Sequence, residues 1–163
     1  MEEISMYSID TIYNMLHWHN NIDNQLQGIK WAKEIDDLSL LILPCENGES
    51  KSLWDNCAKA LYELSDERLE PYLSLLLEWL QDFNWPGSLI ILERLKNFSG
   101  EKLKVPFMDF FNNATNLKNE ERYMWIDNLS ELLENKELRE ELSSEVLGDL
   151  EKHYHNKGWW YKE

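Results

Sequence analysis

The chain has 163 residues, 43% of them hydrophobic, and it contains eight tryptophans. This composition argues against disorder and suffices for one domain with a substantial core. The formal net charge of −15, from 16 basic and 31 acidic residues, disfavours nucleic-acid binding, which depends on Lys and Arg neutralising phosphates. No apolar run is long enough to span a bilayer, and the start MEEISMYS lacks the features of a signal peptide. We therefore expect a cytoplasmic protein that binds neither nucleic acid nor membrane.

Two helices are predicted before the first turn-rich segment. Ser8 can cap the first of them. The second runs from about Ile22 to Ile35, and Gly28 inside it costs about 1 kcal/mol relative to alanine, so we expect Gly28 to permit a close helix crossing. The apolar positions are Ile9, Ile12, Tyr13 and Leu16 in the first helix, and Ile22, Leu26, Ile29, Ala32 and Ile35 in the second.

A short apolar run, Leu38 to Leu43, follows. Its pattern fits a brief helix or a strand, and its helical neighbours favour a helix that stops at Pro44. The segment CENGESK, residues 45–51, is a loop with Asn-Gly as its turn. Ser52 and Asp55 then resemble a capping box for the next helix. The apolar side of that helix is Leu53, Cys57, Ala60, Leu61 and Leu64.

The two cysteines, Cys45 and Cys57, have no CxxC spacing. Cys57 falls on the apolar side of a predicted helix, and Cys45 falls in a turn. A buried small hydrophobic residue and a redox pair are the two interpretations, and the spacing favours the first.

The central element is a helix over Leu69 to Phe83, capped by Ser65. Its apolar residues cover most of the circumference, so we expect it at the centre of the fold, covered on more than one side. Pro71 either kinks this helix or marks its true start, with a turn before it. The apolar positions are Leu69, Tyr72, Leu73, Leu75, Leu76, Leu77, Trp79, Leu80 and Phe83.

The segment Asn84-Trp85-Pro86-Gly87 predicts a tight elbow at Asn84–Trp85, with Pro86 in the first turn of a return helix. The return helix covers Leu89 to Leu95 and ends at Asn97 to Gly100.

Three further helical stretches are predicted. Pro106 suits the start of the first, and the second covers roughly Glu120 to Leu133. The last, Glu137 to His153, is expected to break near Ser143–Ser144. Their apolar positions are Phe107, Phe110, Phe111 and Ala114; Tyr123, Ile126, Leu129 and Leu133; and Leu138, Leu142, Leu147 and Leu150.

No segment alternates with period two for long enough to form a sheet strand. The chain is therefore predicted to be all-α, with about seven short helices. Stacked antiparallel pairs of such helices form a single-domain right-handed α-solenoid of the HEAT or armadillo kind. We divide the domain, residues 1–163, into an N-terminal helical extension (1–50), a core (51–134) and a C-terminal helix with an aromatic tail (135–163).

Residues 53–95 carry a distinctive motif, Leu-Leu-x-Trp-Leu-Gln-Asp-x-Asn-Trp-Pro-Gly, which ends at Gly87. This segment resembles a bacterial domain family of unknown function. The resemblance implies a compact HEAT-like helical fold, and it brings no catalytic residue. It also implies a role as an immunity protein, because relatives of this general type often lie beside polymorphic toxins. The first fifty residues resemble an N-terminal helical extension of longer relatives.

The elbow is the candidate partner-binding site, formed by Trp79, Gln81, Asp82, Asn84 and Trp85. In the structural interpretation, the polar groups cap backbone N–H groups and the indoles pack over the turn. In the functional interpretation, a polar pocket between aromatic rings grips a partner or a small ligand. One carboxylate with two side-chain amides is a poor set of groups for catalysis.

We expect no metal and no cofactor. The pairs Asp36–Asp37 and Glu120–Glu121 lack the spacing of a calcium loop. His153 and His155 lie in a terminal segment that is expected to fray, without further ligands. The adjacent Trp159 and Trp160 are expected to pack as a lid on the end of the stack.

The sequence thus predicts a monomeric, non-enzymatic module that binds another protein. As an immunity protein it would neutralise a basic toxin domain by docking, although solubility alone also accounts for an acidic surface. The alternative is an enzyme or small-ligand-binding protein with a pocket near Trp79, Asp82 and Trp85. A third interpretation is a structural subunit that forms a homodimer.

Overall fold

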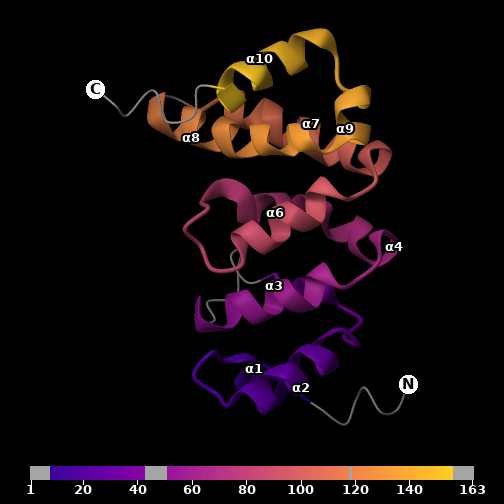
Figure 1. Cartoon of the computed structure of the whole chain (residues 1–163), viewed down its shortest axis with the longest axis vertical. Helices are drawn as coiled ribbons and strands as arrows, with labels where there is room; N and C mark the ends of the chain where they lie inside the picture. Colours follow the sequence, from indigo (N-terminus) through magenta and orange to yellow (C-terminus); the bar gives the residue numbers. More distant parts are fainter. Residues whose placement is uncertain (1–7, 43–50, 118, 156–163) are drawn as a thin grey trace.

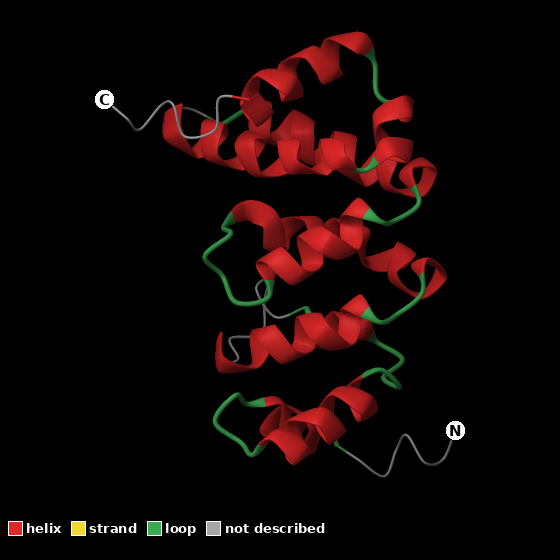
Figure 2. Ribbon diagram, in the orientation of Figure 1, coloured by secondary structure: helices red, strands yellow, loops and turns green. Residues whose placement is uncertain are grey.

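The computed structural model describes residues 8–42, 51–117 and 119–155 of the chain. Within these ranges all regular secondary structure is helical and no strand occurs, which confirms the all-α prediction. The helices lie across the long axis of the molecule and are stacked along it, from α1 and α2 at one end to α7–α10 at the other (Figure 1). Short connections lie at the two edges of this stack (Figure 2).

The first layer consists of α1 (Ile9–Leu16) and α2 (Ile22–Ala32). The Ser8 side chain accepts the Thr11 N–H at the start of α1, as predicted. The close crossing at Gly28 is also confirmed, since a Cβ there would lie 2.9 Å from the Met15 Cβ. The predicted apolar face of α2 is wrong at its first two positions: Ile22 and Leu26 are 64% and 59% exposed, because none of the described helices covers this face near the start of α2, although Ile29 further along it is buried.

The 3₁₀ turn η2 (Leu38–Leu41) confirms that the short apolar run is helical, while Pro44 lies outside the described residues. A further 3₁₀ turn, η3 (Lys51–Leu53), leads into α3 (Trp54–Tyr62). The predicted capping box is wrong: among the described residues no side chain caps α3, and the Ser52 hydroxyl instead hydrogen-bonds His17 Nδ1 at 2.6 Å. The Ser52 hydroxyl, which the local pattern assigned to the cap, is therefore used in a tertiary contact with the segment after α1.

The central apolar segment is divided into short elements. These are α4 (Asp66–Leu69), η4 (Glu70–Tyr72), α5 (Leu73–Glu78) and η5 (Trp79–Gln81). Pro71 lies in η4, which supports the prediction that a turn precedes the main helix and corrects the continuous helix, because proline supplies no N–H for an α-helical bond.

The apolar prediction for this segment holds in most positions. Leu69, Leu73, Leu76, Leu77, Trp79 and Leu80 are buried, whereas Tyr72, Leu75 and Phe83 are half-buried. The segment packs against α7 through α5, and against α6 and α8 through η5. The central segment is therefore covered on more than one side, as its apolar circumference predicts.

The return helix α6 (Ser88–Lys96) precedes α7 (Gly100–Thr115). Pro106 was predicted to start a helix, but it lies inside α7. The start is set earlier by Ser99, whose side chain accepts the Lys102 N–H. The predicted apolar residues of α7, Phe107, Phe110, Phe111 and Ala114, are all buried.

The last layer contains α8 (Asn119–Ser130), the 3₁₀ turn η6 (Glu131–Glu134), α9 (Lys136–Glu141) and α10 (Ser144–His155). The predicted break near Ser143 is confirmed, since α9 and α10 are separate helices. One cluster of buried apolar residues extends from Ile12 in α1 to Leu150 in α10.

Side chains of later elements close the carboxyl ends of earlier helices. Asn56 of α3 donates to the Leu16 carbonyl at the end of α1, at 2.7 Å. The guanidinium of Arg68 in α4 donates to the carbonyls of Lys33 and Ile35, just after α2. Carbonyls at the end of a helix, or just beyond it, have no partner within that helix, so these donors satisfy them and tie neighbouring layers together.

The same arrangement recurs further along the stack. Arg94 of α6 donates to the Leu64 carbonyl after α3 at 2.9 Å, and Asn128 of α8 donates to the Leu80 carbonyl in η5 at 2.8 Å. Asn135, before α9, closes the end of α6. The layers are thus joined by polar contacts as well as by the apolar core.

Candidate functional site

The elbow between η5 and α6 is built from two successive turns. The Trp85 N–H donates to the Asp82 carbonyl and the Ser88 N–H donates to the Trp85 carbonyl, both at 3.1 Å. Gly87 has φ +82° and ψ −13°, which with proline before it defines a type II turn. The chain therefore reverses over Asp82–Gly87. Pro86 was predicted to lie in the first turn of the return helix, but it belongs to the turn before that helix.

Trp79 and Ser88 hold the elbow from inside. The Trp79 indole donates to the Pro86 carbonyl at 2.9 Å, and the Ser88 hydroxyl donates to the Trp79 carbonyl at 2.8 Å. Both residues are fully buried. Trp79 therefore fills a structural role, with its one polar group already bonded.

The polar residues of the elbow are nearer the surface. The Asp82 carboxylate accepts the Asn84 N–H at 2.8 Å, and the Gln81 carbonyl accepts a bond from Asn128 at 3.2 Å. Asn84 is exposed, and Gln81, Asp82 and Trp85 are half-buried. Of the five predicted site residues, these four contribute to the surface of the elbow and Trp79 does not.

Trp54 of α3 extends this aromatic group. Its ring meets those of Trp79 and Trp85 edge-on, with centroids 6.5 and 5.9 Å apart. Its indole Nε1 is buried and has no hydrogen-bond partner among the described residues, which leaves a donor beside the elbow. The sequence pattern placed Trp54 only in a neighbouring helix, since contact between α3 and the elbow is tertiary.

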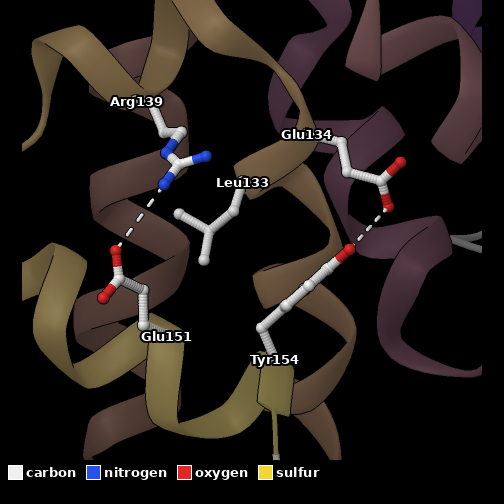
Figure 3. Close-up of a pocket in the computed structure, with 5 residues that line it drawn as sticks. All are labelled: Leu133, Glu134, Arg139, Glu151 and Tyr154. Carbon is white, nitrogen blue, oxygen red and sulfur yellow. Dashed lines mark hydrogen bonds and ion pairs between the residues drawn. The ribbon is translucent and has the colours of Figure 1, made fainter.

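A second candidate site is a pocket of about 280 Å³ in the last layer. Arg139 and Glu151 form an ion pair across it at 3.7 Å, and the Tyr154 hydroxyl donates to Glu134 at 3.4 Å. Leu133 lies between the two pairs (Figure 3). The Arg139–Glu151 ion pair is long and exposed, so it contributes about 0–1 kcal/mol.

Lys96 of α6 lies 3.4 Å from Glu134, one of the residues that line this pocket. Burial lowers the pKa of Lys96, but the hydrogen bond and charge of Glu93, together with the charge of Glu134, raise it overall above its ordinary value. Lys96 is thus a fixed cation, and the pocket carries both charge signs. The residues that line the pocket come from η6, α9 and α10, so no local sequence pattern indicates this site.

His153 corrects the prediction of a frayed terminal segment. It lies in α10, is 7% exposed, and its Nδ1 is 2.7 Å from the Asp127 carboxylate of α8. The Tyr123 ring lies 6.0 Å away, centroid to centroid. The pair joins α10 to α8 and orients the imidazole. Because Asp127 and His153 are 26 residues apart, no local sequence pattern predicts their contact.

Two further predictions concern metal binding and membrane insertion. Among the described residues, no group of three His, Cys, Asp or Glu side chains is placed to hold a metal, and no helix is long and apolar enough to cross a membrane. The side chains of Glu120 and Glu121, and the residues Cys45, Trp159 and Trp160, lie outside what the structure describes.

Cys57 is fully buried in α3, and burial raises the pKa of its thiol far above the ordinary range. Because the thiolate is the reactive form, we expect Cys57 to resist alkylation in the folded protein. In a Cys45→Ser variant, iodoacetamide should label Cys57 only after unfolding in guanidinium chloride, as measured by mass spectrometry. Rapid labelling under native conditions would contradict this burial.

These features define an all-helical protein whose layers are joined by short turns and by side-chain donors. The model of a domain of unknown function, DUF5071, matches residues 51–153, which is more than half of the chain. The chain belongs to this family. The match covers the elbow and almost all of the last layer, and α1 and α2 lie outside it. No curated protein and no solved structure matched the chain.

Proposed function

We propose that the protein is a monomeric binding module for a basic protein partner, built as a right-handed α-solenoid of the HEAT or armadillo kind. Two features support the solenoid: the succession of helices along one axis (Figure 1), and the repeated closing of a helix end by a donor from a later element. Each layer of a solenoid contacts mainly its neighbours. The bonds that close helix ends here likewise join one layer to the next.

The observation that carries the binding function is the distribution of acidic charge. The chain has a formal net charge of −15, and exposed carboxylates occur on every layer, including Asp10, Asp37, Glu67, Glu101 and Glu140. A surface of one charge sign speeds association with a partner of the opposite sign. The elbow residues Gln81, Asp82, Asn84 and Trp85 offer polar and aromatic groups for such a contact.

An immunity protein that neutralises a basic toxin domain by docking is the specific form of this proposal. It rests on the resemblance of residues 53–95 to domains that lie beside polymorphic toxins, together with the acidic surface. Such a role needs tight binding and no turnover. The protein would act in the cytoplasm of a bacterium, with no cofactor.

The proposal is tested by affinity purification of the tagged protein from its source organism at low and at high salt. We expect one basic protein in stoichiometric amount at low salt, with less of it at high salt because screening weakens the attraction. Recovery of no partner at either salt concentration would contradict the binding function. A stable homodimer in sedimentation would instead favour a structural subunit.

An enzyme or small-ligand-binding protein with a site at the elbow is the second candidate. The observation that favours it is the buried Trp54 Nε1, which has no partner among the described residues and lies in the ring group of Trp79 and Trp85. A Trp54→Phe variant removes this donor while keeping the aromatic packing. If a metabolite mixture raises the melting temperature of the natural protein but not of this variant, the second candidate replaces the first.

A further inference from the structure

The pocket in the last layer is lined by groups that fit a long basic side chain. Leu133 supplies an apolar wall and Tyr154 an aromatic ring, and the carboxylates of Glu134 and Glu151 lie on either side of Leu133 (Figure 3). The side chains of Glu134 and Glu151 are 46% and 47% exposed. Arginine and lysine combine an apolar stem, which packs against apolar surface, with a cationic head that stays near water.

The volume of the pocket limits the size of its occupant. The pocket measures about 280 Å³, whereas pockets that hold drug-sized ligands measure about 300–1,000 Å³. Its walls come from three elements, and η6 packs against both α9 and α10. This size matches one long side chain better than a large cofactor.

Negative charge is concentrated around this pocket. Residues 134–151, which include three of its five lining residues, hold seven carboxylates and two basic side chains, a net charge of −5 over 18 residues. The net charge is only −3 over residues 8–42 and −3 over residues 51–117. The strongest field therefore lies at the α9–α10 end of the stack (Figure 1), and a basic partner is drawn toward that end.

Two cations lie near the pocket carboxylates without neutralising them fully. Lys96 Nζ lies 3.4 Å from Glu134 but is shared with Glu93, to which it donates at 2.9 Å. The nearest guanidinium nitrogen of Arg139 lies 3.7 Å from Glu151, beyond hydrogen-bond distance, and the Arg139 side chain is 51% exposed. A half-exposed guanidinium held this weakly loses little by turning outward.

We propose that this pocket receives an arginine or lysine side chain of the basic partner. The stem of that side chain packs against Leu133 and the Tyr154 ring, and its cationic head lies against the carboxylates of Glu134 and Glu151. This inference rests on the proposed function, and it names both the end of the stack that the partner contacts and the type of residue that anchors the partner there. Arginines seated in pockets are frequent anchors of protein interfaces.

An acidic group bound by Arg139 is the opposite occupant. It would meet two pocket carboxylates and the surrounding net charge of −5, and like charges brought together weaken binding. The test therefore includes an acidic probe, whose preferred binding would overturn the inference.

The test uses the full isotope-labelled chain and four single-residue probes. Nα-acetyl-arginine amide and Nα-acetyl-lysine amide carry the proposed groups. Nα-acetyl-citrulline amide has nearly the shape of the arginine probe without its charge, and Nα-acetyl-glutamate amide carries the opposite charge. NMR titration at low salt follows the backbone amide signals, and those of Leu133, Arg139 and Tyr154 report on the pocket.

Two double variants separate the pocket from the general acidic field. E134Q/E151Q removes both pocket carboxylates, whereas E140Q/E145Q removes two exposed carboxylates of the same segment that do not line the pocket. Both variants lose the same amount of charge, so only the position of the lost charge differs between them. All four side chains are accessible to solvent, so the fold is expected to stay intact, and the same NMR spectra report whether it does.

We expect at least one basic probe to shift the pocket signals saturably, and the stronger of the two identifies the side chain. E140Q/E145Q should bind that probe within about twofold of the natural protein, and E134Q/E151Q at least about tenfold more weakly. Equal shifts with the citrulline probe, stronger binding of the glutamate probe, or undiminished binding by E134Q/E151Q would each overturn the inference.

Affinity purification separates failure of this inference from failure of the proposed function. If a basic partner is recovered, E134Q/E151Q should bind it at least about tenfold more weakly than E140Q/E145Q does. A partner that the two double variants bind equally overturns the pocket as its contact and leaves the binding function standing. If no basic partner is recovered, the proposed function fails, and the NMR titration alone decides whether the pocket takes a basic side chain.

Discussion

Replacing Gly100 with alanine is expected to destabilise the protein by about 3 kcal/mol or more. Gly100 is the first residue of α7, where a Cβ would overlap the backbone of Glu137 and Leu138 at the start of α9 and lie 2.6 Å from the Glu137 Cβ. Backbone atoms cannot move aside as a flexible side chain does, so α7 and α9 would have to separate. Urea unfolding followed by circular dichroism measures the loss.

Gly148 provides the matched control in the same layer. It lies within α10, and no atom lies within 4 Å of the position that a Cβ would occupy there. Alanine is therefore expected to stabilise the protein by about 0.5–1 kcal/mol, through its higher helix propensity. A Gly100→Ala variant as stable as the natural protein would show that α7 and α9 do not approach this closely.

Asn135→Ala is the second substitution with a large expected effect, a loss of about 2–4 kcal/mol. The Asn135 amide donates to the carbonyls of Leu95 and Phe98 at 2.8 and 2.9 Å, and its oxygen accepts the Leu138 N–H at 3.1 Å. Asn135 is 3% exposed, so alanine leaves all three backbone groups without this partner and away from water. The midpoint of urea unfolding reports the change.

Two further substitutions separate the role of the Asn135 donor from that of its acceptor. Asn135→Asp keeps an oxygen for the Leu138 N–H but places a negative charge against the two carbonyls, so we expect it to destabilise at least as much as alanine. Asn113→Ala, at an exposed position of α7, should change stability by less than about 0.5 kcal/mol. If Asn135→Ala behaves like Asn113→Ala, the closing of helix ends does not stabilise the stack.

Several elements were predictable because their signals are local. Ser8 and Ser65 cap helices by accepting N–H groups three residues ahead, which requires only the right residue before an apolar period. The apolar positions from Phe107 to Ala114 and from Leu53 to Leu64 were identified correctly, since burial follows helical spacing. An elbow at Asn84–Trp85 was likewise indicated by residue type, and the structure extends the reversal over Asp82–Gly87.

Other predictions failed where a local pattern had several solutions. Pro106 was expected at a helix start but lies within α7, because Ser99 begins that helix earlier. Ser52 was expected to cap α3 but bonds His17. In the second case the hydroxyl bonds a partner that the nearby sequence does not include.

The candidate sites show the same division. The elbow was found from its motif because its residues are adjacent in the chain, but burial of Trp79 depends on packing. The Trp54 donor, the pocket around Leu133 and the pair of Asp127 with His153 join residues from separate helices. No periodicity or spacing predicts such contacts, because they depend on how helices are placed in three dimensions.

The sequence by itself determined that this protein is helical, where most of its helices lie and which side of each is apolar, because helical hydrogen bonds and capping connect residues only a few positions apart. Only the tertiary structure decided which apolar sides are covered: Ile29 of α2 is buried while Ile22 on the same helix is exposed. Tertiary structure also decided which distant donors close each helix end. The physical reason is that the hydrophobic effect is not directional, so which apolar side chains are buried depends on the neighbours that the tertiary fold places beside them.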